Sequence, residues 1–159
     1  MHKKEIIASS LAPFLADLNA AGGEWAVFGS AALILNGMDM EAGDIDILLG
    51  TREAEILEER WNALRIVEQN PMEKKDSPFR SRLSKFRSPQ LTVELSGGLE
   101  IRKAGTWQPV TVHEVHTSAQ GIRFCTLEEC KRLLTLFGRP KDMERLQCIS
   151  RQEALAQGR

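Results

Sequence analysis

Hydrophobic positions in the first third of the chain switch between helical and strand-like spacing. Apolar residues between positions 6 and 18 recur on one helical stripe that contains Pro13, so we expect a helix that kinks at Pro13 or begins at Ser10. Gly22-Gly23 ends this helix. The runs that follow predict strands over residues 25–28 and 45–49, a short buried helix over 31–35, and a helix over 52–64 capped by Thr51.

The second half of the chain has mainly the period-two pattern of strands. After a loop predicted over residues 70–78, alternation indicates strands over 80–87, 91–95, 99–103, 106–115 and 122–125, with turns at Gly97-Gly98 and Gly105. A capping box at residues 126–129 predicts a helix over 127–137. Pro140 suits the first turn of a last helix over 141–149, with Met143, Leu146 and Ile149 inward and a polar tail beyond. These patterns predict one α+β domain over residues 1–159.

Composition narrows the range of partners and locations. Apolar residues make up 42% and charged residues 27% of the 159 residues, and the net charge is −1. The chain as a whole therefore has no positive electrostatic field, and its sequence contains no basic stripe. Neither feature that would favour a nucleic-acid partner is present in the sequence. Cys125, Cys130 and Cys148 lack paired C-x-x-C spacing, which favours buried thiols in a reducing compartment. Since no apolar run reaches the ~20 residues of a membrane span, we expect a cytoplasmic protein with no membrane partner.

Two carboxylates open the strand predicted over residues 45–49. Asp44 and Asp46 are two residues apart, so they share one face of the strand, with about 6.6 Å between their alpha carbons. Such neighbours repel unless a cation lies between them, and Mg²⁺ or Mn²⁺ takes hard oxygen ligands from carboxylates and phosphate. A D-x-D pair alone is also common at strand ends where both acids face water. The metal assignment therefore depends on the residues around the pair.

Gly29-Ser30 and Glu94 are the residues that we expect to lie around the aspartate pair. The glycine lets backbone amides approach an anion, and the serine hydroxyl donates a further hydrogen bond, so the turn suits the phosphates of a nucleoside triphosphate. Residues 91–95 alternate, so Glu94 points away from Val93 and Leu95. If this strand pairs beside the aspartates, Glu94 completes a two-metal centre.

The segment from Gly29-Ser30 through Gly37 to Asp44-x-Asp46 resembles the nucleotidyltransferase superfamily, whose fold is shared with DNA polymerase beta. It looks most like the small antibiotic nucleotidyltransferases and the minimal nucleotidyltransferases of toxin–antitoxin and abortive-infection systems. The ending Gly138-Arg139-Pro140-Lys141-Asp142 is also similar to these proteins. The resemblance implies the nucleotidyltransferase fold, with a mixed sheet flanked by helices and with C-terminal helices.

The resemblance also implies roles for individual residues. Gly29 and Ser30 would hold the triphosphate, and Asp44 and Asp46 would hold Mg²⁺. Glu94 would help to bind metal and would deprotonate the acceptor hydroxyl. The three acids are therefore our candidate catalytic and metal-binding residues.

Candidate phosphate-binding cations must come from elsewhere, because related proteins often carry an arginine before D-x-D and this chain has none over residues 38–42. Arg80 and Arg82 share one strand face, and Lys85 and Arg87 share the other. We select Arg82 as nucleotide-binding, although a charged, solvated edge strand explains the same pattern. Lys141 is the second candidate, although its place at a helix start also accounts for it.

Two functions follow from these assignments. The first is Mg²⁺-dependent transfer of a nucleoside monophosphate from a nucleoside triphosphate to a hydroxyl of a small molecule, such as an antibiotic, or of a macromolecule. A bulky acceptor would need a second copy of the chain or a partner protein. The alternative is a catalytically inactive binding module or toxin–antitoxin component, because fold does not determine function.

Overall fold

The computed structural model describes residues 2–67 and 77–158, so the loop predicted over residues 70–78 lies almost entirely outside the described residues. The helices and 3₁₀ turns are α1 (Lys3–Leu11), η1 (Ala12–Phe14), α2 (Leu15–Ala21), α3 (Gly29–Leu35), α4 (Thr51–Arg60), η2 (Asn62–Leu64), α5 (Leu127–Phe137) and α6 (Pro140–Gln157). The strands are β1 (Ala26–Phe28), β2 (Asp44–Leu49), β3 (Arg65–Ile66), β4 (Phe79–Arg87), β5 (Thr92–Lys103), β6 (Thr106–Pro109), β7 (Val115–Thr117) and β8 (Arg123–Cys125).

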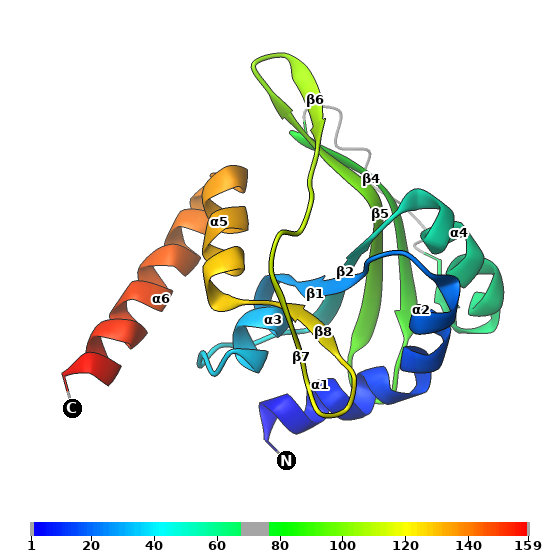
Figure 1. The fold of residues 1–159 in the computed structure, drawn as a ribbon, viewed down its shortest axis with the longest axis horizontal. Coiled ribbons are helices and arrows are strands. Elements are labelled where there is room, and N and C mark those ends of the chain that lie inside the picture. Colours follow the sequence, from blue (N-terminus) through cyan, green and yellow to red (C-terminus); the bar gives the residue numbers. More distant parts are fainter. Residues whose placement is uncertain (1, 68–76, 159) are drawn as a thin grey trace.

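Within the described residues, the strands form one mixed sheet in the order β3-β4-β5-β2-β1-β8-β7, with β6 paired to β5. β2 lies at the centre of the sheet, antiparallel to β1 and parallel to β5. Helix α4 packs against β4 and β5 and contacts α2, whereas α5 and α6 lie on the other side of the sheet (Figure 1). The predicted α+β class, with a mixed sheet flanked by helices and with C-terminal helices, is confirmed.

The hydrophobic core lies largely between the sheet and the N-terminal helices. The inward residues of β2 and β5, including Ile45, Ile47 and Val93, are fully buried. Beside them, the indole ring of Trp61 makes edge-to-face contacts with Phe14 at 4.7 Å and Phe86 at 5.3 Å between ring centroids. This packing fixes the position of β2 and therefore of the side chains on its opposite face. None of the described helices is long and apolar enough to cross a lipid bilayer.

The N-terminal helix is interrupted at the predicted place. Pro13 lies in the 3₁₀ turn η1 between α1 and α2, where its missing amide hydrogen costs little. Gly22 ends α2 with a positive φ of 80°. In α4, by contrast, Thr51 is the first helical residue and Gly50 occupies the cap position, so the predicted cap was wrong.

Gly97-Gly98 does not form the predicted turn, because β5 runs through both glycines without a break. The register with β4 shifts beside them, so an extra residue of β5 forms a bulge. A Cβ atom at Gly97 would lie 2.7 Å from the Cβ of Ala54 on α4, and one at Gly98 would collide with Thr51. The two glycines therefore permit close packing of α4 on the strand instead of reversing the chain.

The strand predicted over residues 106–115 is also wrong in its middle. β6 ends at Pro109 and β7 begins at Val115, and residues 110–114 between them form an irregular connection that we call the strap. The backbone amides of His113 and Glu114 in the strap donate hydrogen bonds to the carboxylate of Glu129 on α5. A side chain from a distant helix thus takes the place of a strand partner.

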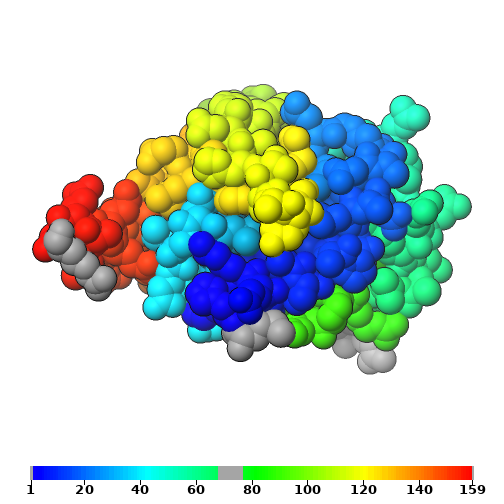
Figure 2. Space-filling view, turned by 60° about the horizontal axis from the view of Figure 1, so that its bottom comes forward, coloured from blue at the N-terminus to red at the C-terminus, as the bar shows by residue number. Residues whose placement is uncertain are grey.

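Helix α6 is longer than the sequence pattern predicts. It continues to Gln157, through the segment that we expected to be a polar tail. Ile149 is buried as expected, but Met143 is 46% exposed. The C-terminal end of α6 projects from the rest of the molecule (Figures 1 and 2).

Candidate active site

Three acidic side chains share the face of the sheet that looks toward α5 and α6. Asp44 and Asp46 alternate with the buried Ile45 and Ile47, so both carboxylates point away from the core. In the parallel register of β2 and β5, Asp46 lies directly opposite Glu94. Adjacent strands are about 4.8 Å apart. The sheet therefore places Glu94 beside Asp46, as predicted.

The turn at Gly29-Ser30 contacts this acidic face. Gly29 has a positive φ of 69°, a conformation that favours glycine. A Cβ atom at this position would lie 3.0 Å from Oδ2 of Asp46. Ser30, 8% exposed, follows at the start of α3. The turn predicted to bind phosphate and the acids predicted to bind metal are thus next to each other.

A cleft of about 490 Å³ joins these features. One part of its lining contains most of the predicted site residues: Gly29, Ser30, Asp44, Asp46, Glu94 and Lys141. Another part is apolar and comes from β4, β5 and α5: Phe79, Leu83, Leu99, Leu133, Leu134 and Phe137. The cleft lies between the sheet and the α5–α6 pair, so it is large enough for a small ligand and has both charged and apolar walls.

The electrostatics of the cleft centre on Asp46. Burial, followed by the negative charge of Asp44, raises the pKa of Asp46 from its ordinary value of 3.8 to about 6. The positive charges of Arg145, Lys141 and Lys85 lower this pKa, but they do not restore the ordinary value. Burial and the charge of Asp44 therefore outweigh the nearby cations at Asp46.

Helix α6 brings two of these cations to the cleft. Lys141 and Arg145 are one helical turn apart, and both line the cleft. The start of α6 is fixed by Arg139, whose Nε donates to Oδ2 of Asp142 at 2.7 Å and whose Nη2 donates to Oδ1 at 3.1 Å. Asp142 is fully buried and also accepts the backbone amide of Arg139, so it caps the start of α6.

Arg82, the strand cation selected from the sequence, lies on the wrong face of the sheet. Its Nε donates to Oε2 of Glu58 on α4 at 2.7 Å, and its Nη1 lies 3.3 Å from Oε1 of Glu55. Lys85 has the opposite orientation, since it is the direct partner of Glu94 in the antiparallel register and acts on Asp46. The β4 cation at the site is therefore Lys85.

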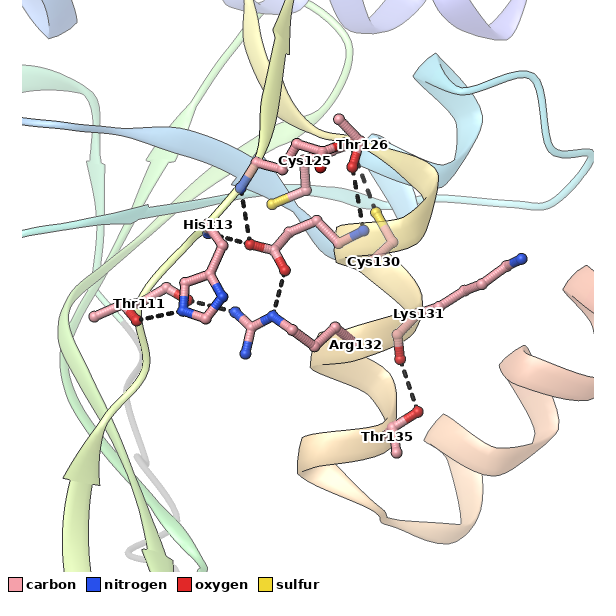
Figure 3. Close-up of polar contacts among 10 residues, drawn as sticks. Thr111, His113, Cys125, Thr126, Cys130, Lys131, Arg132 and Thr135 are labelled. Atoms are coloured by element: carbon pink, nitrogen blue, oxygen red, sulfur yellow. Dashed lines mark hydrogen bonds and ion pairs between the residues drawn. The ribbon is translucent and has the colours of Figure 1, made fainter.

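The wall formed by α5 is tied to the strap by hydrogen bonds from both members of an ion pair within α5, the buried Glu129 and the partly exposed Arg132. Arg132 Nε donates to Glu129, and Arg132 Nη2 donates to the carbonyl oxygen of Thr111 at 2.7 Å. Figure 3 shows Arg132 on α5 directed toward Thr111 and His113 of the strap. Because Glu129 also accepts two strap amides, these hydrogen bonds together hold α5, and with it the cleft wall, against the strap.

Two of the three cysteines are buried thiols as predicted, whereas Cys148 on α6 is only partly buried. Cys125 and Cys130 are free and buried. Burial raises the pKa of each thiol to about 12. Cys130 lines the cleft, but with so high a pKa it is not a nucleophile near neutral pH.

The aspartate pair has the chemistry to hold a divalent cation. Two adjacent carboxylates, one with a raised pKa, are stabilised by a cation between them, and Mg²⁺ commonly takes one or two carboxylates together with phosphate oxygens. Among residues 2–67 and 77–158, no three His, Cys, Asp or Glu side chains gather closely enough to hold a metal. Glu94 is therefore a neighbour of the pair and not part of a preformed three-carboxylate cluster.

Sequence reasoning missed Arg145, and among the strand cations it selected Arg82 instead of Lys85. The spacing of Lys141 and Arg145, four residues apart on a predicted helix, was a usable signal, because such residues share a helical face. The alternation along β4 separated Lys85 from Arg82, but it did not indicate which face α4 would cover.

Comparison with known proteins rests on structure. Neither a protein-family model nor a curated protein matches this sequence. A proposed nucleotidyltransferase from Thermotoga maritima is similar in structure, with a TM-score of 0.70, 22% sequence identity and 96% of each chain covered. The antibiotic-resistance factor ANT(2'')-Ia is similar with a TM-score of 0.51, 15% identity, and coverage of 94% of this chain and 85% of that chain. Together with the mixed sheet and the acidic face of β2, these similarities show that the chain has the nucleotidyltransferase fold.

Proposed function

We propose that this protein transfers a nucleoside monophosphate from a nucleoside triphosphate to a hydroxyl group and releases pyrophosphate. The observation that carries the proposal is the single cleft that contains Asp44, Asp46, Glu94 and the Gly29-Ser30 turn, within a nucleotidyltransferase fold. Phosphoryl-type transfer depends mainly on positioning and charge neutralisation, which these side chains would provide together with a divalent metal.

Each part of the cleft has a separate task. The Gly29-Ser30 turn binds the β- and γ-phosphates through its amides and hydroxyl, and Lys141 and Arg145 neutralise them from the opposite wall. Asp44 and Asp46 hold Mg²⁺ or Mn²⁺ together with phosphate oxygens. When bound there, the metal would neutralise charge on the α-phosphate and on the leaving pyrophosphate.

The chemical step requires one proton acceptor. The acceptor oxygen attacks the α-phosphorus, the bond from that phosphorus to the bridging oxygen breaks, and pyrophosphate leaves. Glu94, on the strand beside Asp46, takes the hydroxyl proton. Lys85 is the register partner of Glu94 on β4 and lies on the same side of the sheet.

The proposal is tested with α-labelled ATP, Mg²⁺ and a panel of hydroxyl acceptors: small polyhydroxylated antibiotics, protein hydroxyls and polynucleotide ends. We expect the wild type to label one acceptor class, and Asp46→Asn to reduce labelling at least a hundredfold. Asp39→Asn is the matched control, because its side chain is 90% exposed and does not line the cleft. Equal labelling by the wild type and Asp46→Asn would remove the catalytic assignment.

Calorimetry separates this activity from the non-catalytic alternative. Tight Mg²⁺-dependent binding of ATP without transfer to any acceptor class would indicate a nucleotide-binding module. Loss of that binding in Asp46→Asn would still assign the cleft as the nucleotide site.

A further inference from the structure

One polar stripe of helix α6 runs from the cleft to the far half of the helix. It consists of residues spaced four, three and four apart, which share one helical face: Lys141, Arg145, Cys148 and Gln152. The two cations line the cleft, whereas Gln152 does not. We propose that Gln152 is a positioning residue, which holds α6 at the angle at which Arg145 reaches the phosphates of the nucleotide. This inference rests on the proposed function.

Gln152 binds the backbone of Asp39 at two points. The carboxamide oxygen of Gln152 accepts the amide of Asp39 at 2.8 Å, and its Nε2 donates to the carbonyl oxygen of Asp39 at 2.8 Å. The same nitrogen donates to Sγ of Cys148 at 3.3 Å. With one hydrogen for each acceptor, both hydrogens of Nε2 are used, so the carboxamide is held in one orientation. Because both partner atoms on Asp39 belong to the backbone, the contact depends on where that backbone lies.

The backbone that Gln152 binds is itself anchored. Asp39 belongs to residues 38–43, which we call the entry loop and which lead directly into β2 and the aspartate pair. Nζ of Lys3 on α1 donates to the carbonyl oxygen of Met40 at 2.9 Å, and it lies 3.2 Å from Oδ1 of Asp39. The entry loop therefore gives Gln152 a fixed point on the N-terminal part of the molecule.

The contact of Gln152 differs from the ion pair that holds the same half of α6. Glu153 pairs with Lys131 of α5 at 2.6 Å, so it joins two helices that belong to the same wall of the cleft. Gln152 instead joins that wall to the loop before β2. It therefore sets the separation between the cations of α6 and the acids of β2.

The geometry of a helix explains how so distant a contact acts on Arg145. The start of α6 is fixed by the contacts of Arg139 with Asp142, and the helix packs against α5 (Figure 1). At about 1.5 Å of rise per residue, Arg145 lies roughly 8 Å and Gln152 roughly 18 Å from that start. A tilt of the helix about its start therefore moves Arg145 more than Lys141, which lies in the first turn.

Calorimetry with Mg²⁺ and the best-bound of the four ribonucleoside triphosphates measures the effect. Gln152→Met removes both contacts to Asp39 and keeps the length of the side chain. We expect it to weaken binding about fivefold, because a displaced Arg145 keeps its charge but loses its directed contact. Gln152→Asn, which is one methylene too short to reach both backbone atoms, should have the same effect. Gln147→Met is the matched control, because Gln147 is exposed on the same helix.

A double variant separates positioning from a general loss of structure. If Gln152 acts through Arg145, then Gln152→Met should change the affinity by less than about twofold when Arg145→Ala is already present. A purely structural role would weaken binding equally in both backgrounds. Urea denaturation of each variant measures any change in stability independently of binding.

The possible results have distinct meanings. Weaker binding in the wild-type background, with almost no further change beside Arg145→Ala, supports the inference. Equal weakening in both backgrounds, or unchanged affinity in both Gln152 variants, overturns it and leaves the proposed function standing. Failure of the wild type to bind any of the four triphosphates overturns both.

Discussion

Asp46 combines the features on which the chemistry of the cleft depends. It is held against Gly29, it lies opposite Glu94 on the neighbouring strand, and its pKa is raised by burial and by Asp44. A buried carboxylate with a like-charged neighbour destabilises the folded protein when it is ionised. Ionised Asp46 therefore lowers the stability of the metal-free protein, and the same carboxylate is suited to bind a cation.

The pH dependence of stability follows from that raised pKa. Since the folded protein holds the Asp46 proton more tightly than the unfolded chain does, the contribution of this group is fully present below pH ~4 and is lost as pH rises through about 6. Without metal at pH 7.5, we expect Asp46→Asn to raise the free energy of unfolding by about 1–3 kcal/mol, measured by urea denaturation. The difference from the wild type should vanish near pH 4.

Addition of Mg²⁺ at pH 7.5 provides the control. The ion should stabilise the wild type and leave Asp46→Asn unchanged, because a cation removes the repulsion between the two aspartates. A variant that is less stable than the wild type at pH 7.5 without metal would contradict the assigned electrostatics.

A second prediction for a single residue concerns Arg145. It lines the cleft from α6 and its charge lowers the pKa of Asp46. We expect Arg145→Ala to raise the KM for the triphosphate about tenfold, because a charge-assisted contact to phosphate is lost. Arg151→Ala, an exposed arginine on the same helix, should leave KM unchanged. An equal effect of both substitutions would indicate general charge attraction instead of a positioned contact.

The sequence alone predicts the orientation of some site residues correctly and that of others wrongly. Asp44 and Asp46 were predictable because alternation along a strand is a local property, and the buried Ile45 and Ile47 made it unambiguous. Arg82 was assigned to the wrong face because its orientation depends on where α4 packs. That packing is determined by tertiary contacts, which local alternation does not encode.

At the scale of elements, the glycine pair at residues 97–98 produced one wrong boundary. Gly97-Gly98 has the composition of a turn, but in β5 it allows α4 to approach the strand closely. Both uses of glycine exploit the missing side chain, so the dipeptide alone does not distinguish them. The interrupted strand before β7 has a different cause, because Glu129 on α5 binds strap amides that a strand partner would otherwise bind.

The packing of α4 on β5 is testable by substitution. A Cβ atom at Gly97 would lie 2.7 Å from that of Ala54, so Gly97→Ala should lower the free energy of unfolding by about 1–3 kcal/mol in urea titrations. Gly43→Ala is the matched control, because a Cβ atom there meets nothing within 4 Å.

A second substitution tests the same contact between Gly97 and Ala54. Removing the opposing methyl in the double variant Gly97→Ala with Ala54→Gly should recover part of the stability lost in the single variant. A Gly97→Ala protein as stable as the Gly43→Ala control would show that the helix does not pack this closely.

At the scale of the whole molecule, the sequence predicted the class of fold and the acidic half of the cleft. Those features come from short segments whose residues are adjacent in the chain or paired on neighbouring strands. The rest of the cleft forms where α5 and α6 pack over the sheet, which brings Phe137, Lys141 and Arg145 opposite residues far away in the sequence. No local pattern specifies that arrangement, so the apolar wall of the cleft was not predicted.

The central claim is that the cleft binds a nucleoside triphosphate and a divalent metal at the aspartate pair. A crystal structure with a non-hydrolysable triphosphate and Mn²⁺ tests it most directly, because Mn²⁺ is located by its anomalous signal. We predict an anomalous peak bound by Asp44 and Asp46, with the β- and γ-phosphates at the Gly29-Ser30 turn. A triphosphate bound elsewhere, or metal density away from both aspartates, would contradict the account.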